Sequence, residues 1–385
     1  MFNVCVGHSI DPLSSQAIQE VVEQCREQLG SSCPSAGILL CAINFDYPLL
    51  LDYIHRCWPE IALIGGTTVG EMSSRLGFHE DSLALILFSS DDIEMRAGVG
   101  RGVSKDAEAA AQQAIPVFDS GTPSLCYVIG EALGVDGVAL ANGFDAALGK
   151  DVTIFGGLSG DDWQFKKTYQ FFGREVLSDA VVTLIFSGNL LISSGVATGQ
   201  HPIGRQGVVT KSVGNTIHEV DGESVKVFYE RYFGSALSVQ LAGGSWGGAV
   251  AVFEPGEENF YVRSPNNQDS ALGCIEYFGG IPEQSSIQFT ETNTEALLAA
   301  AREALEKALA VYPGNEPDAA LIVSCSSRMK VLGTRAKDEH IIAQQVLGDI
   351  PNIGFHAFGE ICPLADKGKS YFHNETFTAV LMGTH

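Results

Sequence analysis

A short glycine-rich motif that ends in a carboxylate occurs three times in this chain. Each copy follows an apolar run, which predicts a buried strand that breaks into a tight turn. Each copy is followed, after a polar loop of variable length, by a further apolar run. The copies span residues 61–71, 152–161 and 353–360, and they end in Glu71, Asp161 and Glu360. Because self-similarity of this kind decides an architecture, the sequence predicts one structural unit used about three times.

The segments around each motif alternate between strand and helix patterns. Continuous apolar runs such as 37–43 and 319–325 are typical of strands that are covered on both faces. The clearest helix begins at a capping box, Thr292-x-x-Glu295, and we expect it to follow the first strand of the third unit at 286–289. The sequence therefore predicts an α/β fold with two packed domains, built from about three repeated strand–helix–strand units with mixed β-sheets.

The region between the second and third units lacks the full repeat. It contains an expected hairpin around Gly214, a glycine-rich stretch at 242–249 and a polar loop at 265–270. A chain of 385 residues is long enough for two domains. Since proline and glycine interrupt the patterns near 201–207, we predict an N-terminal domain at 1–205 and a C-terminal domain at 206–385.

The composition of the chain argues against some classes of binding partner. The net charge is −23 and the isoelectric point is near 4.6, so nucleic acid and anionic membrane surfaces are not expected partners. No apolar run approaches the roughly 20 residues that cross a bilayer, and the first residues lack a basic signal segment, so we expect a cytoplasmic protein. The nine cysteines have no metal-ligand spacing, which indicates reduced thiols, most of them in the core.

Polar groups of several kinds gather around the third glycine turn. We expect a ligand site there, because ligands in open α/β sheets bind at strand ends. Arg328 needs an anionic partner if it is buried, and Glu360 or a ligand would serve. In one alternative, Arg328–Glu360 is a structural pair and the cleft lies at the domain boundary near His201. In a separate alternative, Glu71, Asp161 and Glu360 only cap exposed backbone N–H groups. The candidate ligand-binding residues are Cys325, Arg328, His356, Glu360, His373, Asn374, Glu71 and Asp161.

Short motifs occur at 65–71, 155–161, 220–222, 261–264, 281–283, 324–328, 359–361 and 373–376. They resemble the motifs of the FIST family, the paired N- and C-terminal FIST domains of bacterial sensory proteins. The resemblance spans nearly the whole chain. Two positions differ from the common pattern: Gly66 stands where many relatives carry cysteine, and His356 where an aromatic residue is commoner.

The resemblance implies a function in signal transduction. It implies a cytoplasmic ligand-binding sensor, and the closest format is that of stand-alone haem proteins that sense nitric oxide and regulate a partner histidine kinase. On this interpretation haem is the cofactor, and the candidate iron ligands are His201, His356 and His373. The family also implies an alternative ligand class, small amino-acid-like metabolites. We expect no catalysis, although a thiol-dependent enzyme that uses Cys325 is a further alternative.

Overall fold

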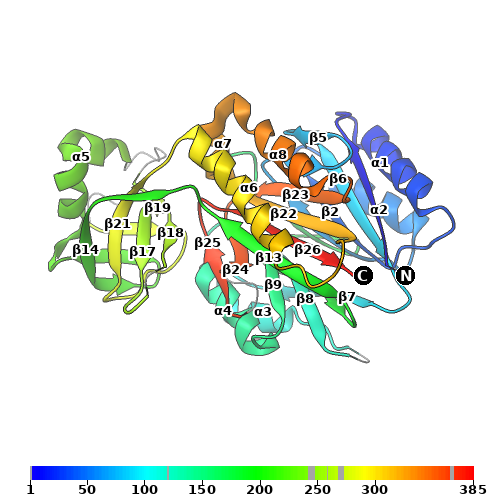
Figure 1. Cartoon of the computed structure of the whole chain (residues 1–385), viewed down its shortest axis with the longest axis horizontal. Coiled ribbons are helices and arrows are strands. Elements are labelled where there is room, and N and C mark those ends of the chain that lie inside the picture. The colour runs from blue at the N-terminus through cyan, green and yellow to red at the C-terminus, as the bar shows by residue number, and fades with distance from the viewer. Residues whose placement is uncertain (1, 119–120, 242–247, 258, 268–272, 365–367) are drawn as a thin grey trace.

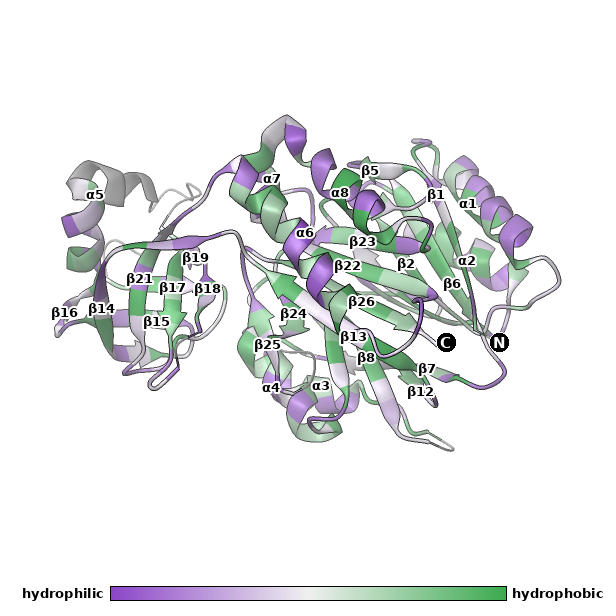
Figure 2. Cartoon of the chain, in the orientation of Figure 1, coloured by the Kyte–Doolittle hydropathy of each residue, from purple (hydrophilic) through white to green (hydrophobic). Residues whose placement is uncertain are grey.

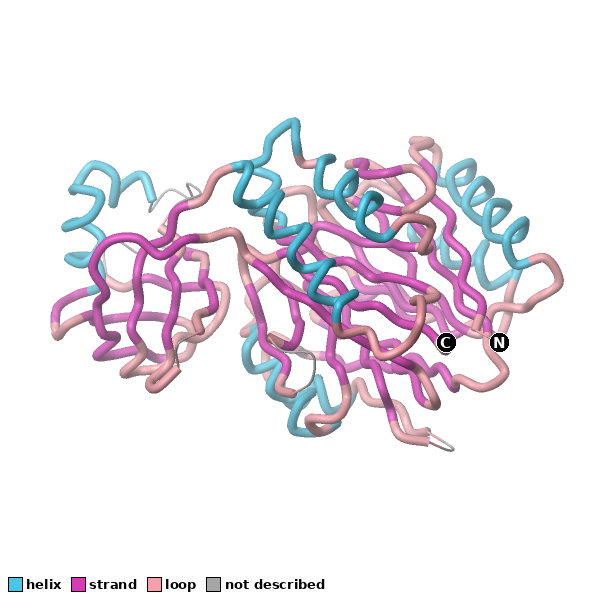
Figure 3. The backbone as a smooth tube through the Cα atoms, viewed as in Figure 1, coloured by secondary structure: helices cyan, strands magenta, loops and turns pink. Residues whose placement is uncertain are grey.

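The computed structural model describes residues 2–118, 121–241, 248–257, 259–267, 273–364 and 368–385. Figure 1 shows a large α/β body with a smaller β-rich domain beside it, and Figure 3 shows that strands dominate both parts. We call the smaller domain, residues 201–291, the insert. The predicted glycine-rich stretch at 242–249 and the polar loop at 265–270 lie partly outside the described residues.

The body consists of three units of similar element order. The first contains β1 (Asn3–Ser9), α1 (Ser14–Leu29), β2 (Ala36–Cys41), α2 (Tyr47–Cys57), β3 (Ala62–Thr67), β4 (Glu71–Ser73), β5 (Gly77–His79) and β6 (Leu83–Ser89). The second contains β7 (Glu94–Arg101), α3 (Ala107–Gln113), β8 (Pro123–Gly130), α4 (Gly137–Leu148), β9 (Thr153–Leu158), β10 (Gln170–Phe172), β11 (Glu175–Leu177) and β12 (Ala180–Ser187). The third contains β13 (Leu191–Ala197), α6 (Thr294–Ala310), β22 (Ala319–Cys325), α7 (Ser326–Leu332), a 3-10 turn (Gly333–Arg335), α8 (Lys337–Leu347), β23 (Asn352–Ala357), β24 (Glu360–Pro363), β25 (Ser370–His373) and β26 (Phe377–Gly383).

The predicted class is confirmed: the fold is α/β and each body sheet mixes parallel with antiparallel pairs. The start of the third unit was predicted wrongly. Its first strand is β13, which pairs with β26, whereas 286–289 belongs to a strand of the insert. Alternation of apolar residues identifies a strand locally, but it does not say which sheet the strand joins.

The short strands after each glycine turn are exchanged between units. The strand after the first turn, β4, pairs with β23 of the third unit. The second unit's β10 pairs with β3, and the third unit's β24 pairs with β9. The three turns therefore meet one another. The Gly160 N–H donates to the Thr67 carbonyl at 2.8 Å, Leu158 N–H to Gly359 O at 2.9 Å, and Val69 N–H to His356 O at 3.1 Å.

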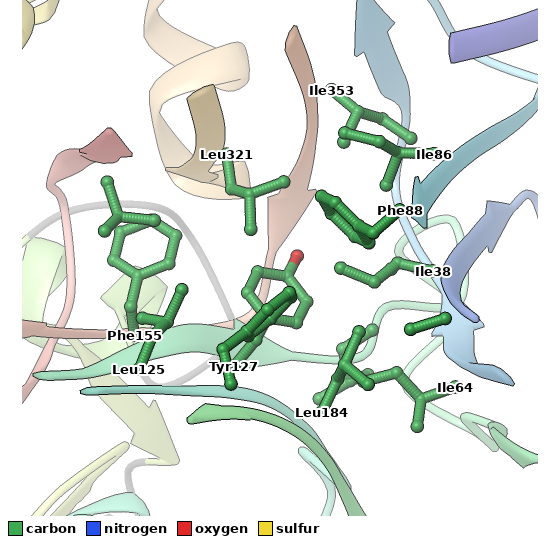
Figure 4. Close-up of a cluster of buried hydrophobic side chains, with 14 of the residues drawn as sticks. Ile38, Ile64, Ile86, Phe88, Leu125, Tyr127, Phe155, Leu184, Leu321 and Ile353 are labelled. Carbon is green, nitrogen blue, oxygen red and sulfur yellow. The ribbon is translucent and has the colours of Figure 1, made fainter. Parts of the chain in front are cut away.

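The body is built around one shared apolar core. The inner faces of the three sheets contribute to it together, and Figure 4 shows Phe88 and Ile38 of the first unit near Tyr127 of the second. Leu321 and Ile353 of the third unit complete the cluster in the same view. The helices cover the outer faces of the sheets, with polar residues toward solvent (Figure 2). Burial of both faces accounts for the continuous apolar strands.

The insert has its own core. Its elements are β14 (His201–Val213), β15 (Thr216–Val220), β16 (Glu223–Ser224), α5 (Val225–Leu241), β17 (Val250–Phe253), β18 (Tyr261–Arg263), β19 (Pro265–Asn267), β20 (Ile275–Tyr277) and β21 (Ser286–Glu291). Aromatic residues of α5 pack on Phe289 of β21. The predicted hairpin at Gly214 is confirmed, with β14 and β15 paired and a positive φ of 58° at the glycine. The predicted boundary at 205/206 falls within β14.

The insert interrupts the third unit between β13 and α6. The cap of α6 differs from the predicted capping box: the Asn293 side chain accepts a hydrogen bond from the Ala296 N–H at 2.9 Å. Thr292 instead donates its hydroxyl to the Gly199 carbonyl at 2.7 Å, in the link that leads from β13 into the insert. The two connections between body and insert are thus tied together at their base.

Candidate functional site

A cavity of about 530 Å³ lies where the insert meets the body. Its walls come from the insert strand β18, helix α6, the β13–β14 link and the turn between β25 and β26. Figure 1 shows where β18 and α6 lie in the fold. We call it the junction cavity. Its lining is Val196, Ala197, Thr198, Gly199, Gln200, His201, Asn259, Phe260, Tyr261, Val262, Ala296, Ala299, Ala300, Glu303, Lys307, Leu364, His373 and Thr376.

The junction cavity contains two of the histidines that the sequence singled out. His373 is the last residue of β25 and is 1% exposed, and His201 is exposed at the first position of β14. From the sequence, a site at the third glycine turn and a site near His201 were alternative predictions. The structure places one residue of each alternative in the same cavity.

The environment of His373 fixes its tautomer. Its Nε2 lies 2.9 Å from the Cys362 carbonyl oxygen, and because a carbonyl only accepts, Nε2 donates. The lone pair is then on Nδ1. Burial, offset in part by this backbone hydrogen bond, lowers the pKa of His373 to about 4. The ring is therefore a neutral imidazole near pH 7, with one nitrogen oriented by a backbone carbonyl, which is the arrangement typical of histidine metal ligands.

The residues that follow His373 attach the insert to the body. Asn374 Oδ1 accepts a hydrogen bond from the Ser264 N–H at 3.3 Å. The buried carboxylate of Glu375 accepts from the Ser264 hydroxyl at 2.8 Å and from the Gln200 amide at 3.3 Å. Glu375 has a φ of 63°, a conformation that non-glycine residues rarely adopt. This turn therefore holds the wall of the cavity in a defined position.

Glu360 and Cys325 lie behind that wall. The Glu360 carboxylate accepts hydrogen bonds from the Thr376 N–H at 3.2 Å and hydroxyl at 2.7 Å, and Thr376 itself lines the cavity. Burial raises the pKa of Glu360 to about 8. Burial, together with the nearby carboxyl groups of Glu360 and Glu375, also raises the pKa of the Cys325 thiol well above its usual range. A thiol in this environment is protonated near pH 7.

Arg328 and His356 belong to a buried ionic cluster instead of a cleft. Arg328 Nε and Nη2 each lie 2.8 Å from Glu339 Oε1, and all three side chains are completely buried. His356 Nε2 lies 3.0 Å from Glu339 Oε2. Burial favours the neutral acid, but Arg328 and the His356 hydrogen bond outweigh it and lower the pKa of Glu339 to about 2. The alternative in which Arg328 pairs with Glu360 is wrong: the partner of Arg328 is Glu339, on α8.

The carboxylates of the first two turns have structural partners. Asp161 accepts hydrogen bonds from three successive N–H groups, those of Phe165, Lys166 and Lys167, at 2.9, 2.6 and 3.0 Å. Glu71 accepts from the hydroxyls of Thr68 and Ser82. Burial raises the pKa of Glu71 to about 8. Neither carboxylate lines the junction cavity.

Most residues in the walls of the cavity carry no signal in the sequence. Glu303 and Lys307 are exposed on α6 and form an ion pair at 2.7 Å, and Phe260 and Tyr261 approach from the insert. The segment 261–264 stood out as a motif, but nothing in it indicated a cavity. A signal for the cavity was nevertheless present in the sequence of α6, which places the small residues Ala296, Ala299 and Ala300 close together.

The junction cavity offers the kinds of group that haem requires. His373 carries a lone-pair nitrogen, the walls include apolar residues such as Phe260 and Leu364, and Lys307 supplies a cation for a carboxylate. His356, in contrast, is completely buried and does not line the cavity. Within the described residues, no group of three or more His, Cys, Asp or Glu side chains is placed to hold a free metal ion. In the same residues, no helix is long and apolar enough to cross a membrane.

Comparisons with known proteins agree with the resemblance seen in the motifs. A family model described as the FIST N domain matches residues 35–223, and one described as the FIST C domain matches residues 227–363. An uncharacterized protein of Mycobacterium tuberculosis is 26% identical over 392 residues, covering 98% of each chain. One of Mycobacterium bovis is 24% identical over 395 residues, covering 98% of this chain and 97% of the relative. A solved structure of a cyanuric acid hydrolase from A. caulinodans aligns over 100% of this chain and 99% of its own, at 8% identity and a TM-score of 0.40.

Proposed function

Since the chain belongs to the FIST family, whose domains are ligand-binding sensors associated with signalling, we propose that it is a cytoplasmic haem-based sensor of nitric oxide that regulates a partner histidine kinase. The observation that carries the proposal is His373 in the junction cavity. A buried, neutral imidazole whose Nε2 is held by the Cys362 carbonyl borders a space of about 530 Å³, within the usual size range of ligand cavities.

Three features of the cavity support haem. His373 would bind the iron through Nδ1, while its bond to Cys362 O keeps the ring in one orientation. Lys307 would meet a propionate, and the apolar side chains of Phe260 and Leu364 would exclude water. Bound haem would supply an iron centre to which nitric oxide binds. His201 is the second imidazole of the same cavity and the alternative ligand.

The position of the cavity suggests how binding is transmitted. Its walls come from both the insert and the body, so a ligand that fills it contacts both parts. Such a ligand favours one placement of the insert over others, and this differential contact is what an allosteric change requires. A coupling of about 1–3 kcal/mol would change the affinity for a partner by roughly 5- to 150-fold. No catalytic step is needed, and the protonated, buried Cys325 thiol speaks against the thiol-enzyme alternative.

A specific observation also favours the alternative ligand class, a small amino-acid-like metabolite. The ion pair of Glu303 and Lys307 lies at the cavity, and the two side chains would meet the ammonium and carboxylate groups of a zwitterion. This ligand would occupy the same cavity and would make no use of the lone pair of His373.

Titration of the purified protein with haemin separates these alternatives. We expect a Soret band that saturates at about one haemin per chain and shifts with nitric oxide. His373→Ala should abolish saturable binding, whereas the matched control His218→Ala, on strand β15 and away from the cavity, should bind like wild type. Loss of binding in His201→Ala alone would move the iron ligand to His201. A weak, non-saturating band in the wild type would reject haem and leave the metabolite.

The kinase part of the proposal has its own test. The acidic protein should be steered toward a basic surface on its partner. Kinase autophosphorylation should differ between saturating concentrations of the nitric-oxide-bound and the nitric-oxide-free protein. Equal rates in the two states would reject the kinase as the output.

A further inference from the structure

A second cavity, of about 510 Å³, also lies between the insert and the body. It contains Arg263 of β18, whereas the junction cavity contains the neighbouring Val262. Its other walls come from α4 and β25 of the body and from the β14–β15 hairpin and the 280–283 loop of the insert. We call it the Arg263 cavity. Its lining is Val138, Ala141, Asn142, Ser212, Gly214, Glu254, Tyr261, Arg263, Gly280, Ile281, Pro282, Glu283, Lys369, Ser370, Tyr371 and Phe372.

Arg263 is a buried cation with no carboxylate partner among the described residues. It is 2% exposed, and its hydrogen bonds go to backbone carbonyls: Nη1 to Val262 and Phe372 at 3.1 and 3.0 Å, and Nε to Gly280 at 3.4 Å. Within that part of the chain Nη2 makes no hydrogen bond, and no acidic group lies within 4 Å of the guanidinium. Since a buried charge is costly without a counter-ion, this position favours an anion from outside the chain.

The acidic groups of the cavity are held by other donors. Glu254 accepts from the Tyr261 hydroxyl at 3.1 Å, and Glu283 accepts from the Ser212 N–H at 3.1 Å. The guanidinium lies over the rings of Tyr261 and Phe372, with its central carbon 4.2 and 5.6 Å from their centroids. The guanidinium is thus in contact with aromatic rings, and its planar fork suits recognition of a planar carboxylate.

Ser370 provides a second, independent observation. Its side chain is completely buried and lines the same cavity, yet its hydroxyl has no hydrogen-bond partner among the described residues. Buried polar groups in folded proteins are almost always paired, so an unpaired hydroxyl that borders a cavity indicates a ligand atom. Lys369, the preceding residue, adds a second cation at the cavity.

We propose that the Arg263 cavity binds a small organic monocarboxylate with an apolar or aromatic body. Arg263 and Ser370 would both donate to the carboxylate, and the rings of Tyr371 and Phe372 would contact the body. Glu254 and Glu283 share the cavity, so a second or third negative charge on the ligand would be repelled, which disfavours phosphate. Although Tyr261 lines both cavities, Arg263 and Ser370 do not line the junction cavity, and the site does not depend on haem.

Calorimetric titration of the full chain with benzoate, hexanoate and inorganic phosphate tests the proposal. We expect saturable binding of at least one carboxylate, and phosphate binding at least about tenfold more weakly. Loss of one hydrogen bond in Ser370→Ala should weaken carboxylate binding by about 2- to 12-fold. Ser193→Ala, which removes another buried, unpaired hydroxyl but lies in β13, should leave binding unchanged.

Arg263→Lys keeps the charge but loses the planar fork, so it should weaken binding more than Ser370→Ala does. If Arg263→Lys does not fold, Ser370→Ala decides the question by itself, because the Ser370 hydroxyl has no hydrogen-bond partner among the described residues that the substitution would remove. No saturable binding of either carboxylate, or equal affinity in wild type and Ser370→Ala, would overturn the proposal. Haemin titration of Ser370→Ala, expected to match wild type, keeps this outcome separate from that of the junction cavity.

Discussion

The buried cluster of Arg328, Glu339 and His356 gives a quantitative test of how the third unit is held together. Glu339 accepts hydrogen bonds from both other members and from the Ser324 hydroxyl at 2.9 Å. Arg328 also donates to the carbonyls of Leu297 and Thr198, at 2.8 and 2.9 Å. The cluster therefore joins α8, α6 and the link that enters the insert.

Glu339→Ala removes the anion and leaves the guanidinium of Arg328 buried without a counter-ion. Removing one partner of a buried ion pair costs about 3–5 kcal/mol, a large part of the roughly 5–15 kcal/mol by which native proteins are stable. The matched control is Glu295→Ala. It breaks the contact of Glu295 with Arg335, but the Glu295 side chain is 79% exposed, so the cost should be only about 0–1 kcal/mol.

Urea unfolding followed by circular dichroism measures both variants. We expect a clearly lower midpoint for Glu339→Ala and a midpoint close to that of wild type for Glu295→Ala. Near-equal shifts in the two variants would refute the reasoning, because the buried carboxylate would then contribute no more than a solvated one.

Two further predictions concern a buried acid and a helix cap. Burial raises the pKa of Glu71 to about 8, above the ordinary value of 4.5, so its contribution to stability should be complete below pH 4.5 and be lost as the pH rises through 8. In wild type this loss should amount to about 1.4 kcal/mol of unfolding free energy per pH unit in that window, and Glu71→Gln should remove it. Urea midpoints of Glu71→Gln measured at pH 5, 6.5 and 8 test this. A fall with pH as steep as that of wild type would contradict the prediction. Asn293→Ala should lower the free energy of unfolding by about 1 kcal/mol through loss of the α6 cap, and an unchanged urea midpoint would show that the cap is dispensable.

Much of the fold was predictable because its signals are local. Apolar runs and glycine turns mark the strands and their ends, and their recurrence marks the units. The pairing of β13 with β26 was not predictable, since the two strands lie far apart in the chain and the insert separates β13 from the rest of its unit. The exchange of β4, β10 and β24 between units was also not predictable, because the pattern of apolar residues in a strand does not indicate which strand pairs with it.

The candidate site was predictable in part. His373 ends β25 and His201 begins β14, and residues at strand ends gather at sheet edges. Arg328 and His356 are also near such ends, but they point to a carboxylate on α8. Glu339 lies in the first turn of α8, where a charged residue is ordinarily exposed, so nothing in the sequence indicated that it faces inward.

The position of the two cavities follows from where the repeat is interrupted. At the centre of the body the three glycine turns form backbone hydrogen bonds with one another, so this repeated motif has a structural role. None of its carboxylates lines either cavity. Only the third unit has the insert between its first strand and its first helix, and both cavities lie where that insert touches the body. A ligand in either cavity contacts both the insert and the body, which are joined by two short links and have separate hydrophobic cores. Movement of the insert relative to the body therefore costs less free energy than a rearrangement of the three glycine turns at the centre of the body. We therefore expect signalling in this protein to consist of movement of the insert against a body that stays constant.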